Sequence, residues 1–166
     1  TTTDLLDKKG IAGRSGVWNP DYGYGRLDAL RAYQMLCGGR ILPDKPTQQS
    51  MGWAYAEIAA NSEHIYRLTG RVKQQLKATV TWHRKLVKLS SARFMEADSF
   101  YLHLKIVSPS GKTVVLEIPD NNNLIKIEHI LAEDGEYRIV LQNPTVTGGR
   151  DYGMAFEFAD FPEEVQ

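Results

Sequence analysis

The feature that most constrains this chain is an alternation of apolar and polar residues with a period of two. In residues 76–83, LKATVTWH, every second side chain is apolar, from Leu76 to Trp82. A β-strand places successive side chains on opposite faces of its sheet, so this pattern predicts a strand with one buried face. We therefore expect Trp82 to lie in a hydrophobic core.

The same alternation recurs along the rest of the chain and predicts a mainly β protein. The further segments are WAYAEI (53–58), HIYRL (64–68), FYLHLKIV (100–107), TVVLEI (113–118), LIKIEHI (124–130), EYRIVLQ (136–142) and YGMAFEF (152–158). In TVVLEI we expect Val114, Leu116 and Ile118 to share one face, and residues 108–111 to form a hairpin turn. About eight strands at this spacing are typical of an antiparallel, jelly-roll-like β-sandwich, and 166 residues with 42% apolar content can bury such a core.

One helix is predicted ahead of the strands. Asp28 can cap its first turn, Leu30, Tyr33 and Leu36 recur at three-residue spacing, and the glycines at 38 and 39 end it. Just before it, YGYG (22–25) contains two glycines that permit a sharp bend. The helix and this turn predict a separate N-terminal part over residues 1–39.

The remaining organisation follows from composition. Residues 40–52 contain two prolines and many polar residues, so they read as a linker or an edge segment, and residues 53–166 form the sandwich. Twenty basic and twenty acidic side chains cancel, which argues against nucleic-acid and membrane partners. The single cysteine cannot form an internal disulfide. An opening on three threonines, without a methionine, suggests a piece of a longer protein.

Candidate chemistry is sparse. Ser15 lies between glycines in GRSG, the nearest approach to a nucleophile turn, but the four histidines are scattered and read as ordinary strand residues. Tryptophans can form sugar platforms, a role left open for Trp18 and Trp53. Loop oxygens of the kind that calcium prefers come from Asp98, Asp120, Asn122 and Asp134, with Asn121 and Glu133 beside them. Solvated turns are the alternative, so the predicted cofactor is calcium or none.

Two N-terminal motifs resemble a known enzyme family. The stretch NPDYGYGRLDALRAYQML (19–36) looks like the end of the catalytic domain in subtilisin-like serine proteases, where a Gly-Tyr-Gly turn leads into the last helix. TTTDL (1–5) resembles the segment that follows the nucleophile-bearing helix of that family. The strands after residue 53 resemble the pre-peptidase C-terminal and proprotein-convertase sandwiches that follow such domains. Their pattern often has an acidic residue after the strand tryptophan, where this chain has His83.

The resemblance implies a role beside an enzyme. No Gly-Thr-Ser-Met-Ala nucleophile motif occurs in these residues, so the Asp, His and Ser blocks would lie upstream and the chain alone is predicted to be inactive. The parent would be a secreted serine endopeptidase, and this part would stabilise or orient its catalytic domain, or help to recruit a protein or peptide substrate. The alternative is a free-standing carbohydrate-binding or adhesive sandwich.

Five apolar residues of the N-terminal part are the predicted contacts with that catalytic domain: Trp18, Tyr22, Tyr24, Leu30 and Tyr33. They cannot all find cover within a segment of this length. We expect them either to fold back onto the sandwich or to cause self-association, because exposed apolar patches mark interaction surfaces.

Overall fold

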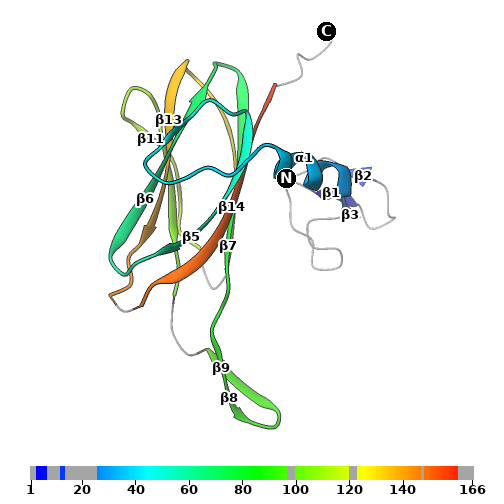
Figure 1. Ribbon diagram of the computed structural model, residues 1–166, viewed down its shortest axis with the longest axis vertical. Helices are drawn as coiled ribbons and strands as arrows, with labels where there is room; N and C mark the ends of the chain where they lie inside the picture. The colour runs from blue at the N-terminus through cyan, green and yellow to red at the C-terminus, as the bar shows by residue number, and fades with distance from the viewer. Residues whose placement is uncertain are drawn as a thin grey trace.

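The computed structural model describes residues 3–6, 12–13, 26–96, 100–119, 123–146 and 148–160. Most of these residues belong to a β-sandwich, in which two sheets pack face to face (Figure 1). One sheet has the strand order β11-β10-β13-β6-β4, with bounds Thr113–Glu117, His103–Val107, Gly135–Asn143, Ser62–Gly70 and Pro46–Thr47. The other has the order β12-β7-β14-β5, with bounds Leu124–Ile130, Gln74–Trp82, Arg150–Asp160 and Met51–Ile58. The predicted antiparallel sandwich is confirmed, and the short β4 alone pairs in parallel among the described strands.

Smaller elements lie outside the two main sheets. They are the three-stranded sheet of β1 (Thr3–Leu6), β2 (Ala12–Gly13) and β3 (Arg26–Leu27), the helix α1 (Ala29–Cys37), and the hairpin of β8 (Leu86–Ser90) and β9 (Arg93–Glu96). Figure 1 shows α1 beside the β14–β5 side of the sandwich, whereas the hairpin projects from one end of it. These two elements lie on different parts of the scaffold.

Strand β7 confirms the alternation that defines the fold. Leu76, Ala78, Val80 and Trp82 are at most 3% exposed, while the residues between them are half-buried or exposed. β7 lies between β12 and β14, so its backbone groups pair on both sides. Its inward face meets the inward residues of the opposite sheet, among them Leu104 and Ile139. The period of two therefore identified the inner face of this strand.

A hydrogen-bonded chain of aromatic hydroxyls crosses the core between the sheets. The hydroxyl of Tyr66 on β6 lies 2.6 Å from that of Tyr152 on β14, and both side chains are fully buried. The Tyr152 hydroxyl also lies 2.7 Å from Nδ1 of His64. Burial raises the pKa of both tyrosines and lowers the pKa of His64. Buried hydroxyls need partners, and these three side chains supply them to one another.

Strand β11 has the shared face that was predicted, but its buried face is the opposite one. Val114, Leu116 and Ile118 do lie on one side, but they are exposed, and the neighbouring Val115 packs against the core instead. The strand has apolar residues at adjacent positions, so alternation alone does not say which side faces inward. The preceding turn is as predicted, since the Gly111 amide donates to the Ser108 carbonyl at 2.9 Å and Gly111 has a φ of +83°.

Residues 40–50 follow the edge of the sandwich. Arg40 pairs with Trp53, Ile41 is buried in the core, and β4 pairs with β6. The amide of Asp44 donates to the carbonyl of Ile65 at 2.7 Å. This segment carries the chain from α1 into the sandwich along a hydrogen-bonded path.

Candidate docking surface on helix α1

Helix α1 begins and ends at the residues that the sequence indicates. The Asp28 side chain accepts a hydrogen bond from the Arg31 amide at 2.9 Å, which caps the first turn. At the other end, the Gly38 amide donates to the Gln34 carbonyl at 2.9 Å and the Gly39 amide to the Leu36 carbonyl at 3.3 Å. A helix of nine residues is marginal by itself in water, so it depends on packing.

One side of α1 is held against strand β5. Met35 is 6% exposed there, and the indole Nε1 of Trp53 donates to the Leu36 carbonyl at 3.2 Å. The helix end and the strand approach closely, because a Cβ on Gly38 would lie 2.7 Å from the carbonyl oxygen of Met51. Only glycine fits at that position without a shift of the backbone. The helix is therefore seated on the sandwich.

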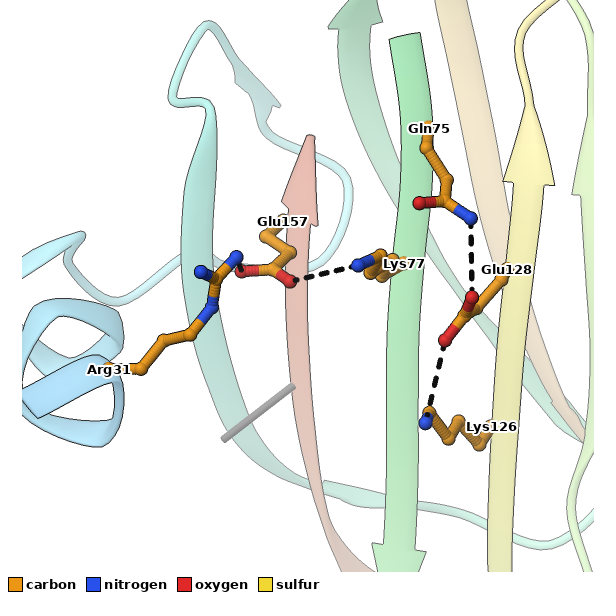
Figure 2. Close-up of polar contacts among 6 residues, drawn as sticks. All are labelled: Arg31, Gln75, Lys77, Lys126, Glu128 and Glu157. Carbon is orange, nitrogen blue, oxygen red and sulfur yellow. Dashed lines mark hydrogen bonds and ion pairs between the residues drawn. The ribbon is translucent and has the colours of Figure 1, made fainter. Parts of the chain in front are cut away.

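A buried carboxylate anchors the same side of the helix (Figure 2). Glu157 on β14 points out of the sandwich toward α1, yet its side chain is only 3% exposed. Its Oε2 lies 3.0 Å from Nη2 of Arg31, and its Oε1 lies 4.0 Å from Nζ of Lys77 on β7. Burial raises the pKa of the Glu157 carboxyl, while the charge of the Arg31 guanidinium and its hydrogen bond lower it. Glu157 is thus ionised at neutral pH and ties α1 to the sheet.

The polar row continues across the sheet to strand β12. Glu128 accepts a hydrogen bond from Nε2 of Gln75 at 3.2 Å and lies 3.5 Å from Nζ of Lys126 (Figure 2). Lys77 stands opposite Glu157 on one neighbouring strand and opposite Glu128 on the other. Opposite charges therefore alternate across the sheet and compensate one another.

The other side of α1 is uncovered. Leu30, Tyr33 and Leu36, here called the α1 stripe, are 63–67% exposed. Three-residue spacing places them on the side away from Met35 and Arg31, with the exposed Cys37 one turn beyond Tyr33. A short helix that is apolar on both sides fits between two bodies, and the sandwich is one of them.

The α1 stripe contains two of the five predicted contact residues, Leu30 and Tyr33. The other three, Trp18, Tyr22 and Tyr24, lie outside the described residues. The predictions omitted Leu36 as a contact, although its three-residue spacing from Tyr33 was the signal that could have identified it.

The candidate calcium ligands are only partly described. Asp98, Asp120 and Asn122, with Asn121, lie outside the described residues. Asp134 accepts a hydrogen bond from the Val72 amide at 2.7 Å, and the neighbouring Glu133 accepts one from Oγ of Ser110 at 2.8 Å. That bond holds the pKa of Glu133 below its usual value. Within the described residues, no group of three His, Cys, Asp or Glu side chains could hold a metal ion.

The described histidines form no nucleophilic site. In the described ranges, no serine hydroxyl is hydrogen-bonded to a histidine ring, and Ser15 lies outside them. Burial lowers the pKa of His64, His103 and His129, while His83 is exposed. Nε2 of His129 is buried without a partner in the part of the chain described here. His64, His103 and His129 lie in strands, as the sequence indicates, whereas His83 lies just beyond the end of β7.

Two tryptophans are engaged in structure. Trp82 is 3% exposed and meets Phe100 edge to face, with ring centroids 6.2 Å apart. Trp53 is half-buried and bonded to α1. The ring of Trp82 is therefore buried and cannot form a sugar platform, and Trp18 lies outside the described residues. In addition, none of the described helices has the length and apolar character that a membrane span requires.

The comparisons with known proteins bear on the fold. No family model and no curated protein sequence matches this chain. By structure it is similar to PliG of Aeromonas hydrophila, a periplasmic inhibitor of g-type lysozyme, with a TM-score of 0.50, 10% identity, and coverage of 72% of this chain and 99% of that one. It is also similar to the pre-peptidase C-terminal domain of a Bacillus anthracis collagenase, with a TM-score of 0.44, 11% identity, and coverage of 72% and 93%. At these identities the likeness is one of fold: a β-sandwich module.

Proposed function

We propose that this chain is a non-catalytic module of a subtilisin-like serine endopeptidase, in which the α1 stripe holds the sandwich against the catalytic domain. In this role the module stabilises or orients that domain and helps to present protein or peptide substrate. The resemblance of residues 19–36 to the end of subtilisin-like catalytic domains motivates the choice of partner. A parent of this class is secreted, so we place the module outside the cytoplasm.

The observation that carries the proposal is the two-sided character of α1. Met35 and Arg31 attach one side to β5 and β14, while Leu30, Tyr33 and Leu36 leave the other side apolar and exposed. A flexible linker between two domains would not need to be attached to the sandwich in this way. A helix fixed on the sandwich and apolar on its outer side instead supports a rigid contact between two domains.

The charge pattern of α1 supports a protein rather than a polyanionic partner. Arg31 is the only charged residue in ALRAYQMLC, and its guanidinium is already paired with Glu157. The stripe therefore offers apolar area without charge. Domain contacts of that kind draw most of their free energy from burying aromatic and aliphatic side chains.

The test uses the region encoded upstream of Thr1. We expect that region to encode a subtilisin-like catalytic domain that binds this chain when the two are produced separately and mixed in a calorimeter. Tyr33→Ser should weaken binding by about tenfold or more, because it removes a large aromatic side chain from the contact. Val146→Ser is the matched control, since Val146 is 86% exposed and lies far from α1 in the sequence.

Two results would contradict the proposal. The first is an upstream region that encodes no such catalytic domain. The second is equal binding by the wild-type chain and the Tyr33→Ser variant, which would place the contact elsewhere on the module. Circular dichroism of each variant confirms that the sandwich is folded in both cases.

A further inference from the structure

Among the strands and the helix from Ala29 onward, the β8–β9 hairpin is the least buried element described. Every residue from 83 to 95 is exposed, and the hairpin extends beyond the end of the sandwich (Figure 1). Trp82 and Phe100, which lie on either side of the hairpin in the sequence, are buried and pack edge to face in the core. The hairpin, here called the arm, therefore projects from a well-packed part of the core.

The arm carries apolar side chains on both faces. Val87 stands opposite Met95 on one face, and Phe94 stands opposite Lys88 on the other, together with Leu86. The large apolar side chains of the hairpin, Leu86, Val87, Leu89, Phe94 and Met95, are 42–63% exposed. A strand pair that rested on a sheet or a helix would be apolar on one face only. This hairpin has the composition of an element that is surrounded by its partner.

The same arm concentrates positive charge. Residues 83–96 contain Arg84, Lys85, Lys88 and Arg93 and one acidic residue, Glu96, which stands opposite Leu86 at the base of the hairpin. The sequence predicts no membrane partner because the net charge of the chain is zero. That total does not show how the charges are distributed, and it conceals this cluster. Apolar side chains interleaved with lysine and arginine are the combination that binds the interface of an anionic bilayer.

We propose that the β8–β9 hairpin is an anchor that inserts its apolar side chains into the interface of an anionic lipid bilayer. Lipid is a deformable partner, so it can surround both faces of the arm, whereas a rigid protein surface would need a matching slot. The cations then lie at the level of the anionic headgroups. Because the arm extends beyond the sandwich, it reaches a flat surface before the rest of the module does. The inference is independent of the proposed protease partner.

The experiment measures binding of the full chain to vesicles. We expect it to sediment with vesicles of phosphatidylcholine and phosphatidylglycerol, to bind vesicles of phosphatidylcholine alone much more weakly, and to be released by salt. Lys88→Gln should lower the partition coefficient about fivefold, as expected for one cation near such a surface. Phe94→Ser should lower it about tenfold or more, because a buried aromatic side chain is lost.

The matched control is Tyr33→Ser. Tyr33 is 65% exposed and Phe94 is 63% exposed, so the two substitutions remove aromatic rings of similar accessibility from α1 and from the arm. Tyr33→Ser should leave vesicle binding unchanged. All variants should unfold at the wild-type midpoint, since the substituted residues make no buried contact.

Three outcomes would overturn the proposal. One is no binding to the anionic vesicles, and another is equal loss of binding in Tyr33→Ser and Phe94→Ser. The third is that the chain does not bind vesicles but binds immobilised polyglutamate, and that Lys88→Gln weakens this binding. That result would assign the arm to an acidic protein surface instead of a membrane.

Discussion

The α1 stripe and the β8–β9 hairpin expose large apolar side chains to a similar extent, yet they are built differently. The stripe is the outer side of a helix whose inner side is seated on β5 and paired with Glu157. The hairpin has no buried side at all. The stripe also contains no charge, whereas four cations are interleaved with the apolar residues of the hairpin.

This difference shows that exposure of apolar residues does not by itself identify a partner. The kind of partner is better indicated by whether the element has a second side packed on the sandwich, and by the charged residues among the exposed apolar ones. A seated, uncharged stripe fits a second protein domain, while a cationic arm that is apolar all round fits a lipid interface. The two proposals therefore assign the two surfaces of this module to different kinds of partner.

The largest effect is expected from the scaffold that both regions share. Trp82→Ala removes a fully buried ring from the end of β7, and the cavity should lower the free energy of unfolding by about 3–5 kcal/mol. Chemical denaturation followed by circular dichroism measures it. If the loss is small, the base of the hairpin is not fixed in the core, and the two regions are less different than described. The control Tyr101→Ala, at a 38% exposed neighbour of Phe100, should cost much less.

A smaller effect is expected from the seat of the helix. Glu157→Gln removes the charge that faces Arg31 and Lys77, and it should lower the free energy of unfolding by about 1–3 kcal/mol at neutral pH. The pKa of Glu157 is lowered in the folded chain, so its stabilising contribution is full above the unfolded value of about 4.3 and is lost as the pH falls through the folded value.

The difference between wild type and Glu157→Gln should therefore be largest near neutral pH and should shrink in acid. Urea unfolding of both chains at neutral pH and in acid measures it. Glu128→Gln, on the same face but 23% exposed, is the control and should show a weaker effect. If the difference in free energy of unfolding between the two chains does not change with pH, the carboxylate charge does not hold the helix.

The smallest effect is expected from the hairpin. Replacing residues 86–95 by a short Gly-Ser turn should change the free energy of unfolding by less than about 0.5 kcal/mol, because no buried contact is lost. The same replacement should abolish vesicle binding. A large loss of stability, seen by thermal unfolding, would show that the hairpin supports the sandwich rather than projecting from it.

The sequence predicted those parts of the fold in which one residue pattern has one structural solution. Alternation in β7 placed Trp82 in the core, and Asp28 with the glycines at 38 and 39 marked the ends of α1. In β11 the adjacent Val114 and Val115 left two choices, and the face that the alternation identified, with Val114, is the exposed one. Local pattern fails where both faces of a strand carry apolar residues.

The two surfaces show the same limit. The hairpin was missed because Leu86 and Val87 are adjacent, Lys88 interrupts them, and its turn contains no glycine or asparagine. Its signal was two short apolar runs on either side of a pair of serines. Likewise, nothing in the sequence indicated that Glu157 is buried. Its partner Arg31 is 126 residues away in the sequence, and only the packing of α1 against the sandwich brings the guanidinium to the carboxylate.

The hydroxyl chain between the two sheets has a direction. When His64 is neutral and carries its proton on Nε2, Tyr66 donates to Tyr152 and Tyr152 donates to Nδ1 of His64, so each hydroxyl proton has an acceptor. A proton on Nδ1 would reverse this order and oblige Tyr152 to donate to Tyr66, whose own proton finds no second acceptor among the described residues. Every hydroxyl proton of this hydroxyl chain therefore has an acceptor in only one tautomer of His64. The chain of contacts starts at Tyr66 on β6, crosses to Tyr152 on β14 and returns to His64 on β6, so the tautomer of one half-buried histidine sets the direction of the hydrogen bond between the sheets.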